Sequence, residues 1–229
     1  MLVSAAFVPA TPLLVPEVSA GAAGELAALR AASINAVAEV LRRAADRVVM
    51  VAPGRSTGAH SGAVSFAGLG VAPEAARPTK DELPVALSVG QWLVEQLMGR
   101  PDEHLTIAHD ATVAECQDLG AQLAGSAARV AAIVVGDGSA CRSDKAPGSF
   151  DERAAAFDQS ASDALASVDT DALLALDVDL AAALQVAGRA PWQVAAAMAQ
   201  ANDLDLVGAL HHRDDPYGVA YFVATWSRG

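Results

Sequence analysis

An acid and a hydroxyl, Asp137 and Ser139, stand two residues apart just after the apolar run 129–135. In an open α/β sheet, ligands bind beyond the carboxyl ends of the strands. The glycines at 136 and 138 allow a tight turn there, which can direct backbone N–H groups toward a ligand. A Gly-Asp-Gly sequence after a strand is also common as a plain turn. The stretch therefore predicts either a ligand site or an ordinary connection.

A second candidate nucleophile is Ser56, which lies in the sequence Gly-Arg-Ser-Thr-Gly at 54–58. The α/β-hydrolases carry their serine in a Gly-x-Ser-x-Gly pattern between a strand and a helix. Here a strand is predicted before the serine, but the glycine-broken run that follows does not favour a helix. A serine hydrolase is therefore kept as an alternative to the main interpretation.

Histidines are candidates for proton transfer or metal binding at several places. His109 ends a predicted strand beside Asp110, so an imidazole and a carboxylate could meet at the ligand edge, or Asp110 could cap the next helix. His60 stands alone in a predicted loop. His211 and His212 are adjacent in a predicted strand, whose successive side chains point to opposite faces, so we do not expect them to share one metal ion.

Strand and helix patterns alternate along the first part of the chain. The predicted strands are short and apolar, at 2–8, 47–52, 83–87, 104–109 and 129–135. The predicted helices repeat their apolar residues at helical spacing, at 21–45, 89–98 and 112–124. Parallel strands need such long crossovers, so this order predicts an α/β fold with a mostly parallel central sheet and helices on both faces.

The rest of the chain is predicted to be helical before it returns to strands. Helices are expected within 151–179, at 180–188 and at 191–202. Strands at 204–211 and 217–226, joined by a turn at 212–216, predict an antiparallel hairpin at the edge of the sheet. The length suits one large α/β domain or at most two small ones, and by itself it does not choose between them.

Charge limits the classes of partner. The 229 residues carry a formal net charge of −12, which repels phosphate backbones and anionic lipids. Neither nucleic acid nor a membrane surface is therefore an expected partner. A small molecule or another protein remains, and the sequence leaves a homo-oligomer open.

The sequence also predicts a cytoplasmic location. No window reaches the ~18 continuous apolar residues of a membrane span. No Lys or Arg precedes Arg30, which argues against a signal peptide. The two cysteines, Cys116 and Cys141, have neither a disulfide framework nor a metal-binding spacing.

In order and spacing, these motifs resemble the class III extradiol ring-cleavage dioxygenases in their B-subunit-like branch, and more distantly the mediator-of-cell-motility family. The segments that carry the resemblance span most of the chain: 7–16, 48–54, 133–141, 187–192 and 215–226. The resemblance implies a single domain of this family over 1–229. It also implies ferrous iron, which active members hold through two histidines and a carboxylate while a further histidine acts as acid and base and oxygen opens a catechol ring.

This sequence departs from the family at the residues that such chemistry needs. The first-strand loop carries Ala10, the second carries Gly54, and Ala140 follows the serine where the acid/base histidine is expected. No glutamate stands near 189–192 for the third ligand. We therefore expect no iron or zinc cofactor and no cleavage of catechols. The main interpretation is a metal-free protein that binds a small ligand or another protein; the alternative is a dioxygenase with displaced histidine ligands.

The resemblance places several polar and aromatic residues around the pocket of the active enzymes. The predicted ligand site consists of Asp137, Ser139, Lys145, Arg189, Trp192 and Tyr217. Lys145 and Arg189 favour a carboxylate or phosphate, and Trp192 could stack on a ring. The expected ligand is therefore a small anionic or aromatic molecule. In the alternative, Asp137 and Arg189 pair with each other and the fold serves assembly alone.

Overall fold

The computed structural model describes residues 1–71, 81–201 and 205–229. Its strands are β1 (Leu2–Val8), β2 (Arg47–Gly54), β3 (Gly58–His60), β4 (Glu103–Ala108), β5 (Val130–Val135), β6 (Leu206–Asp214) and β7 (Tyr221–Arg228). They form one seven-stranded sheet in the order β3-β4-β2-β5-β1-β7-β6. The central strands β4, β2, β5 and β1 run parallel, and β7 and β6 follow as an antiparallel pair. The predicted α/β class, mostly parallel sheet and C-terminal hairpin are confirmed.

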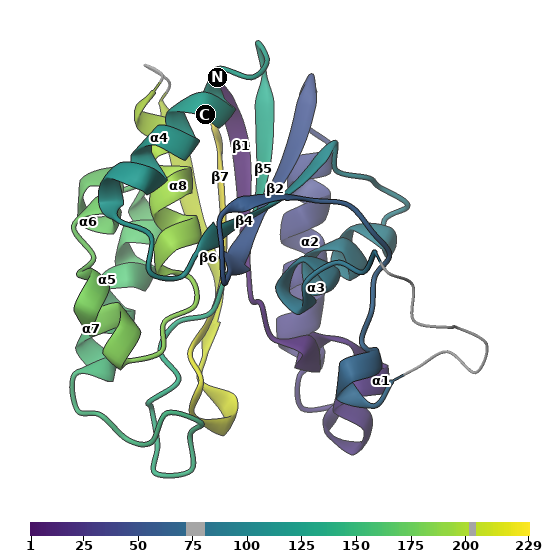
Figure 1. The fold of residues 1–229 in the computed structure, drawn as a ribbon, viewed down its shortest axis with the longest axis vertical. Helices are drawn as coiled ribbons and strands as arrows, with labels where there is room; N and C mark the ends of the chain where they lie inside the picture. Colours follow the sequence, from purple (N-terminus) through teal and green to yellow (C-terminus); the bar gives the residue numbers. More distant parts are fainter. Residues whose placement is uncertain (72–80, 202–204) are drawn as a thin grey trace.

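Helices cover both faces of the sheet (Figure 1). One layer holds α1 (Pro16–Ser19), α2 (Ala27–Leu41) and α3 (Val85–Glu95). The other holds α4 (Val113–Ala124), α5 (Ala154–Ser167), α6 (Thr170–Leu174), α7 (Val178–Ala183) and α8 (Arg189–Gln200). The two layers follow from the crossovers, because β1 reaches β2 through α2 and β4 reaches β5 through α4. No helix in the described part of the chain is both long and apolar enough to cross a membrane.

Strand β5 lies at the centre of the sheet and is buried along its whole length, between β1 and β2. Its side chains leave alternately on opposite faces. Ile133 and Val135 join the core beneath α2 and α3, while Ala132 and Val134 join the core beneath α4 and α8. A strand buried on both faces has to be continuously apolar. The turn 136–141 follows the carboxyl end of this strand, so it lies at the centre of the edge where the parallel strands end.

The region 83–87 is not a strand, contrary to the sequence prediction. Helix α3 begins at Val85 directly after Pro84, and it buries Leu87, Leu93 and Val94. Proline is well tolerated at the start of a helix, because its missing N–H needs no partner there. The short apolar run belongs to a helix face, since its buried positions recur at helical spacing rather than at every second residue.

Thr112 caps helix α4, so the alternative in which Asp110 caps it is wrong. The Thr112 hydroxyl accepts the Glu115 N–H (3.2 Å), and the Glu115 carboxylate accepts the Thr112 N–H (2.8 Å). This reciprocal arrangement satisfies two N–H groups at the helix end. It leaves the Asp110 carboxylate outside the cap.

Several predicted helix boundaries shift. The helix expected at 21–45 begins only at Ala27, after a 3-10 turn at Ala20–Ala22, because the glycines at 21 and 24 weaken helix formation. The helix expected at 180–188 is α7, which begins earlier behind its cap Asp177 and ends at Ala183. Helix α8 begins at Arg189, two residues before Pro191. The predicted boundary at 202–204 lies outside the described residues.

Candidate functional site

The turn 136–141 is held from three directions by backbone hydrogen bonds. The Gly136 N–H donates to the last carbonyl of β1 (2.9 Å), and the Gly138 N–H donates to the Ala220 carbonyl (2.8 Å) just before β7. The Gly188 N–H, at the start of α8, donates to the Asp137 carbonyl (2.7 Å). The turn is therefore a fixed junction between the sheet and α8.

Close packing explains the two glycines of this turn. A Cβ atom on Gly136 would lie 2.5 Å from the Gly188 Cα, and one on Gly138 would lie 2.8 Å from the Ala220 Cβ. Only a residue without a side chain fits at such distances. Because both glycine N–H groups are also bonded within the protein, ligand recognition here depends on side chains.

Asp137 points from the turn toward the loop after β1. Its carboxylate accepts the Ala10 N–H (2.8 Å) and the Thr11 N–H. The Thr11 hydroxyl in turn accepts a hydrogen bond from the buried Tyr221 hydroxyl (3.3 Å) at the start of β7. We call Asp137, Thr11 and Tyr221 the Asp137 cluster. It lies at the carboxyl ends of β1 and β5, the edge at which open α/β sheets bind ligands.

Desolvation raises the pKa values of Asp137 and Tyr221, because neither side chain has a cationic partner in the described chain. Desolvation raises the pKa of Asp137 from 3.8 to about 7, although the two N–H donors lower it. Burial and the nearby Asp137 charge raise the pKa of Tyr221 to about 12. Asp137 is nevertheless only half-buried. A partly exposed carboxyl that titrates near neutral pH, at a ligand edge, is typical of a functional site.

The raised pKa of Asp137 predicts a pH dependence of folding stability. Its pKa is about 7 in the folded chain, against an ordinary value of 3.8, so the folded state holds the proton more tightly. The resulting stabilisation is complete below about pH 4 and is lost as the pH rises through about 7. Urea unfolding of wild type and Asp137→Asn should show the wild type losing free energy of unfolding relative to the variant over this window. A difference that is constant or grows with pH would contradict the assignment.

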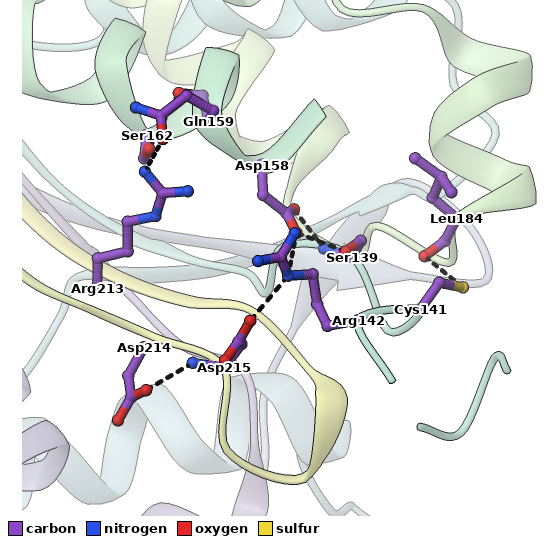
Figure 2. Close-up of polar contacts among 10 residues, drawn as sticks. All are labelled: Ser139, Cys141, Arg142, Asp158, Gln159, Ser162, Leu184, Arg213, Asp214 and Asp215. Carbon is purple, nitrogen blue, oxygen red and sulfur yellow. Dashed lines mark hydrogen bonds and ion pairs between the residues drawn. The ribbon is translucent and has the colours of Figure 1, made fainter. Parts of the chain in front are cut away.

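Ser139 leaves the turn toward α5 (Figure 2). Its N–H and its hydroxyl donate to the two carboxylate oxygens of Asp158, at 2.8 and 2.5 Å. Both side chains are buried. Burial raises the pKa of Asp158, and the Ser139 hydrogen bonds oppose that shift. The pair ties the turn to α5 and uses the hydroxyl proton of the serine.

A cavity of ≈ 220 Å³ lies beside this pair. Its lining residues come from the position just after the turn, from α5 and from the last hairpin: Arg142, Asp158, Arg213, Asp214, Asp215, Ala220 and Phe222. The Arg142 Nε donates to the Asp215 carboxylate (2.8 Å) and lies 3.7 Å from Asp158. Arg213 donates to the side-chain oxygen of Gln159 (2.5 Å). We call this space the arginine cavity (Figure 2).

The Arg189 side chain forms its hydrogen bonds within the protein, in the helix layer that holds α4 and α8. Its guanidinium donates to the carbonyls of Ala111 and His109, both at 2.6 Å, and to the Gln193 side-chain oxygen at 3.0 Å. The residue is only 1% exposed. Arg189 therefore satisfies the backbone where β4 ends, and the alternative in which it pairs with Asp137 does not describe the structure.

Trp192 and Tyr217, also predicted as ligand residues, have partners of their own, and Lys145 is exposed. Trp192 is buried against the ring of Phe222, with centroids 5.8 Å apart. Lys145 is exposed in its loop, and the exposed Tyr217 donates its hydroxyl to Glu25 (2.6 Å). None of the six residues predicted from the sequence lines the arginine cavity. Of the six, Asp137 combines partial exposure with a place at the ligand edge.

The structure adds five functional candidates that the sequence did not single out: Thr11, Tyr221, Arg142, Arg213 and Asp158. Asp158 carried a readable signal, because it shares the buried side of α5 with Phe157, Ala161 and Leu165. A buried acid requires a hydrogen-bond partner inside the protein. The others carried no local signal, because their partners are distant in the chain; Tyr221 and Thr11, for example, are 210 residues apart.

The side chains of the two adjacent histidines of β6 do not point to opposite faces of the strand as expected. A register shift between Leu210 and His212 marks a bulge, and both His211 and His212 line one cavity of ≈ 460 Å³. A bulge adds one residue to a strand and redirects its side chains. His211 bonds to the Thr225 hydroxyl (2.7 Å). Over the described ranges, no three His, Cys, Asp or Glu side chains lie close enough to hold one metal ion.

The residues at the expected iron positions do not fit ferrous iron. Ala10 contributes only its N–H, which is bonded to Asp137. Gly54 and Ala140 have no side-chain donor. The His109 Nδ1 lies 3.3 Å from the Gly54 carbonyl, and it belongs to no group of three potential ligands in the described chain. The expectation that the protein binds no iron stays a prediction for metal analysis.

The turn around Ser56 lacks the surroundings of a hydrolase nucleophile. The residue is exposed, and it is followed by strand β3 rather than by a helix. Its carbonyl accepts a hydrogen bond from the Thr106 hydroxyl (2.7 Å). The strand-to-helix turn that holds the serine of α/β-hydrolases is therefore missing here.

No protein-family model and no curated protein matches the chain. Among solved structures, an uncharacterized protein from Escherichia coli K12 is similar, with a TM-score of 0.51 and 12% sequence identity. The match covers 98% of this chain and 99% of that one. At this level of identity the likeness concerns the fold, and it supports the α/β arrangement along the whole chain.

Proposed function

We propose that this chain is a member of the class III extradiol dioxygenase-like fold that binds a small hydroxylated aromatic molecule at the Asp137 cluster, without the iron chemistry of that family. The observation that carries the proposal is the half-buried Asp137 carboxyl at the ligand edge. A carboxylate has about four acceptor positions, and two are used by the N–H groups of residues 10 and 11. The remaining positions can accept a hydroxyl of a ligand.

The electrostatics of the cluster favour a neutral hydroxyl donor over an anion. Asp137 has no ion pair among the described residues, and Arg189, which the sequence assigned to an anion, is bonded to carbonyls. A phenolic hydroxyl that donates to a carboxylate forms a charge-assisted hydrogen bond. The resemblance supports the same ligand class, because the active enzymes act on catechols.

A cytoplasmic location belongs to this proposal and rests on the sequence.

Catechol is the probe that tests this proposal. A thermal-shift titration should show saturable stabilisation of the wild type, since a ligand stabilises the folded state by RT ln(1 + [L]/Kd). The analogue 1,2-dimethoxybenzene has both hydroxyls blocked and should give no such shift. Asp137→Asn should weaken catechol binding about tenfold, the equivalent of losing one charge-assisted hydrogen bond. Asp144→Asn, at an exposed loop position, is the matched control and should bind as the wild type does.

Two outcomes would overturn the proposal: equal stabilisation by the dimethoxy analogue, or unchanged catechol affinity in Asp137→Asn. Metal analysis of protein prepared without chelator separates the alternatives. One equivalent of iron per chain, lost in His109→Ala or His60→Ala, would favour a dioxygenase with displaced ligands. Reaction of Ser56 with a fluorophosphonate probe would favour a serine hydrolase.

A further inference from the structure

His60 and His104 lie opposite each other on two neighbouring strands. β3 pairs with β4 in antiparallel fashion, and these two residues are direct partners in the register. Opposite residues of antiparallel strands share one face, with Cβ atoms about 4.5–5.5 Å apart. Both side chains are half-buried, and both line a cavity of ≈ 580 Å³. We infer that the two imidazoles together bind a Cu(II) ion.

The hydrogen bonds around His60 fix which ring nitrogen carries the hydrogen. The His60 Nε2 lies 2.8 Å from the Thr106 hydroxyl, and that hydroxyl donates its one proton to the Ser56 carbonyl (2.7 Å). The hydroxyl therefore accepts from His60, whose Nε2 is the donor. A neutral imidazole that donates from Nε2 keeps its lone pair on Nδ1. The His60 Nδ1 has no partner in the part of the chain that the structure describes.

His104 is oriented in the same way from helix α3. The Gln91 amide nitrogen donates to Glu95 (3.0 Å), which turns the amide oxygen toward the His104 Nε2 (2.9 Å). His104 therefore also donates from Nε2 and keeps its lone pair on Nδ1. Burial, and after it the charges of Arg100 and His60, lower the pKa of His104. A lowered pKa favours the neutral imidazole, the form that binds metal.

This arrangement of hydrogen bonds is typical of protein metal sites. A histidine that binds metal donates its other ring N–H to an oxygen, which fixes the tautomer and the ring orientation. The Thr106 hydroxyl and the Gln91 amide oxygen serve His60 and His104 in this way. The two imidazoles therefore offer one lone pair each from the same face of the sheet.

The charge of the cavity favours a cation. The lining contains three carboxylates, Glu95, Asp102 and Glu103, against the one guanidinium of Arg100. Arg47 pairs with Glu103 at 2.7 Å, and with this second cation counted the surroundings are still negative. A metal ion at the histidine pair is therefore attracted by its surroundings.

The number and type of ligands favour copper. Among divalent metals of the first transition row, Cu(II) binds a given site most tightly, and imidazole is one of its preferred ligands. Zinc sites use three or four protein ligands, and within the described ranges no third His, Cys, Asp or Glu completes such a set. Calcium and magnesium prefer oxygen ligands. Two imidazoles therefore suit Cu(II), with water in its remaining positions.

This site is separate from the iron positions that the resemblance implies. His104 is the second residue of β4, whereas the Asp137 cluster lies beyond the carboxyl ends of the parallel strands. Ala10 and Ala140 are not among the residues that line the cavity. Copper at the histidine pair therefore would not restore the ring-cleavage site.

Titration of the metal-free protein with CuSO₄ tests the inference. Pulsed EPR at one equivalent should show two coordinated imidazoles in the wild type and one in His60→Gln or His104→Gln. Loss of a second-shell partner typically weakens metal binding 10–100-fold, so loss of a ligand should weaken it at least about a hundredfold. Competition with glycine measures this affinity. His212→Gln, which alters a histidine of another cavity, is the matched control and should bind as the wild type does.

Three results would overturn the inference: a wild-type spectrum with fewer than two imidazoles, unchanged affinity in both His60→Gln and His104→Gln, or loss of copper in His212→Gln instead. The wild-type spectrum decides even where a variant fails to fold. The test is independent of the proposed function. Asp137→Asn should bind Cu(II) as the wild type does, and His104→Gln should bind catechol normally when copper is absent.

Discussion

Arg189→Ala is expected to lower the free energy of unfolding by about 3 kcal/mol. The substitution leaves the carbonyls of Ala111 and His109 without the donors that now bond them at 2.6 Å, in a place where Arg189 is 1% exposed. The bond to the Ala111 carbonyl is buried and the bond to the His109 carbonyl is part-buried. A buried acceptor left unsatisfied costs about 1–3 kcal/mol, and truncation leaves a cavity. Relief from burying a cation without a carboxylate partner offsets part of this cost. For a chain of this length, the melting temperature should fall by about 10 °C.

Lys145→Ala is the matched control, because Lys145 is also a cation of the predicted ligand site but is exposed. Its stability should stay within about 0.5 kcal/mol of the wild type. Chemical unfolding followed by tryptophan fluorescence measures both variants. If Arg189→Ala were as stable as the wild type yet lost a ligand, Arg189 would be a binding residue, and its carbonyl contacts would not explain its presence.

Gly136→Ala is the second substitution expected to have a large effect, of about 3 kcal/mol. The new Cβ would lie 2.5 Å from the Gly188 Cα, and a backbone atom cannot rotate away as a flexible side chain can. Overpacking costs about 1–3 kcal/mol. Separation of the two segments would also strain the hydrogen bond from the Gly188 N–H to the Asp137 carbonyl (2.7 Å), worth about 1 kcal/mol. Because this bond positions the turn, catechol binding at the Asp137 cluster should weaken as well.

Gly58→Ala is the control for the added methyl group. A Cβ atom at Gly58 meets nothing within 4 Å, so its unfolding free energy should differ from that of the wild type by at most about 0.5 kcal/mol. Urea unfolding at one pH compares the three proteins. Equal stability of Gly136→Ala and Gly58→Ala would contradict the close contact between Gly136 and Gly188.

The sequence by itself determined the elements whose patterns are local. The run at 129–135 is readable as a central strand because both faces of β5 are buried, which requires apolar residues at every position. The crossover helices and the final hairpin follow from periodicity and turn residues in the same way. Where two local readings compete, as at 83–87, the pattern fails, because a short apolar run fits either a strand or the first turn of a helix.

Tertiary structure alone decided which polar residues belong to a site. Arg189 has the same side chain whether it grips a ligand or bonds the carbonyls of residues 109 and 111, which are about 80 positions earlier in the chain. Asp137 and Ser139 are neighbours in sequence, yet one turns to the loop after β1 and the other to α5. Partners that are distant in the chain leave no trace in local spacing. Hydrogen bonding and desolvation depend on those partners, so the roles of these residues became readable only when the sheet and its two helix layers were assembled.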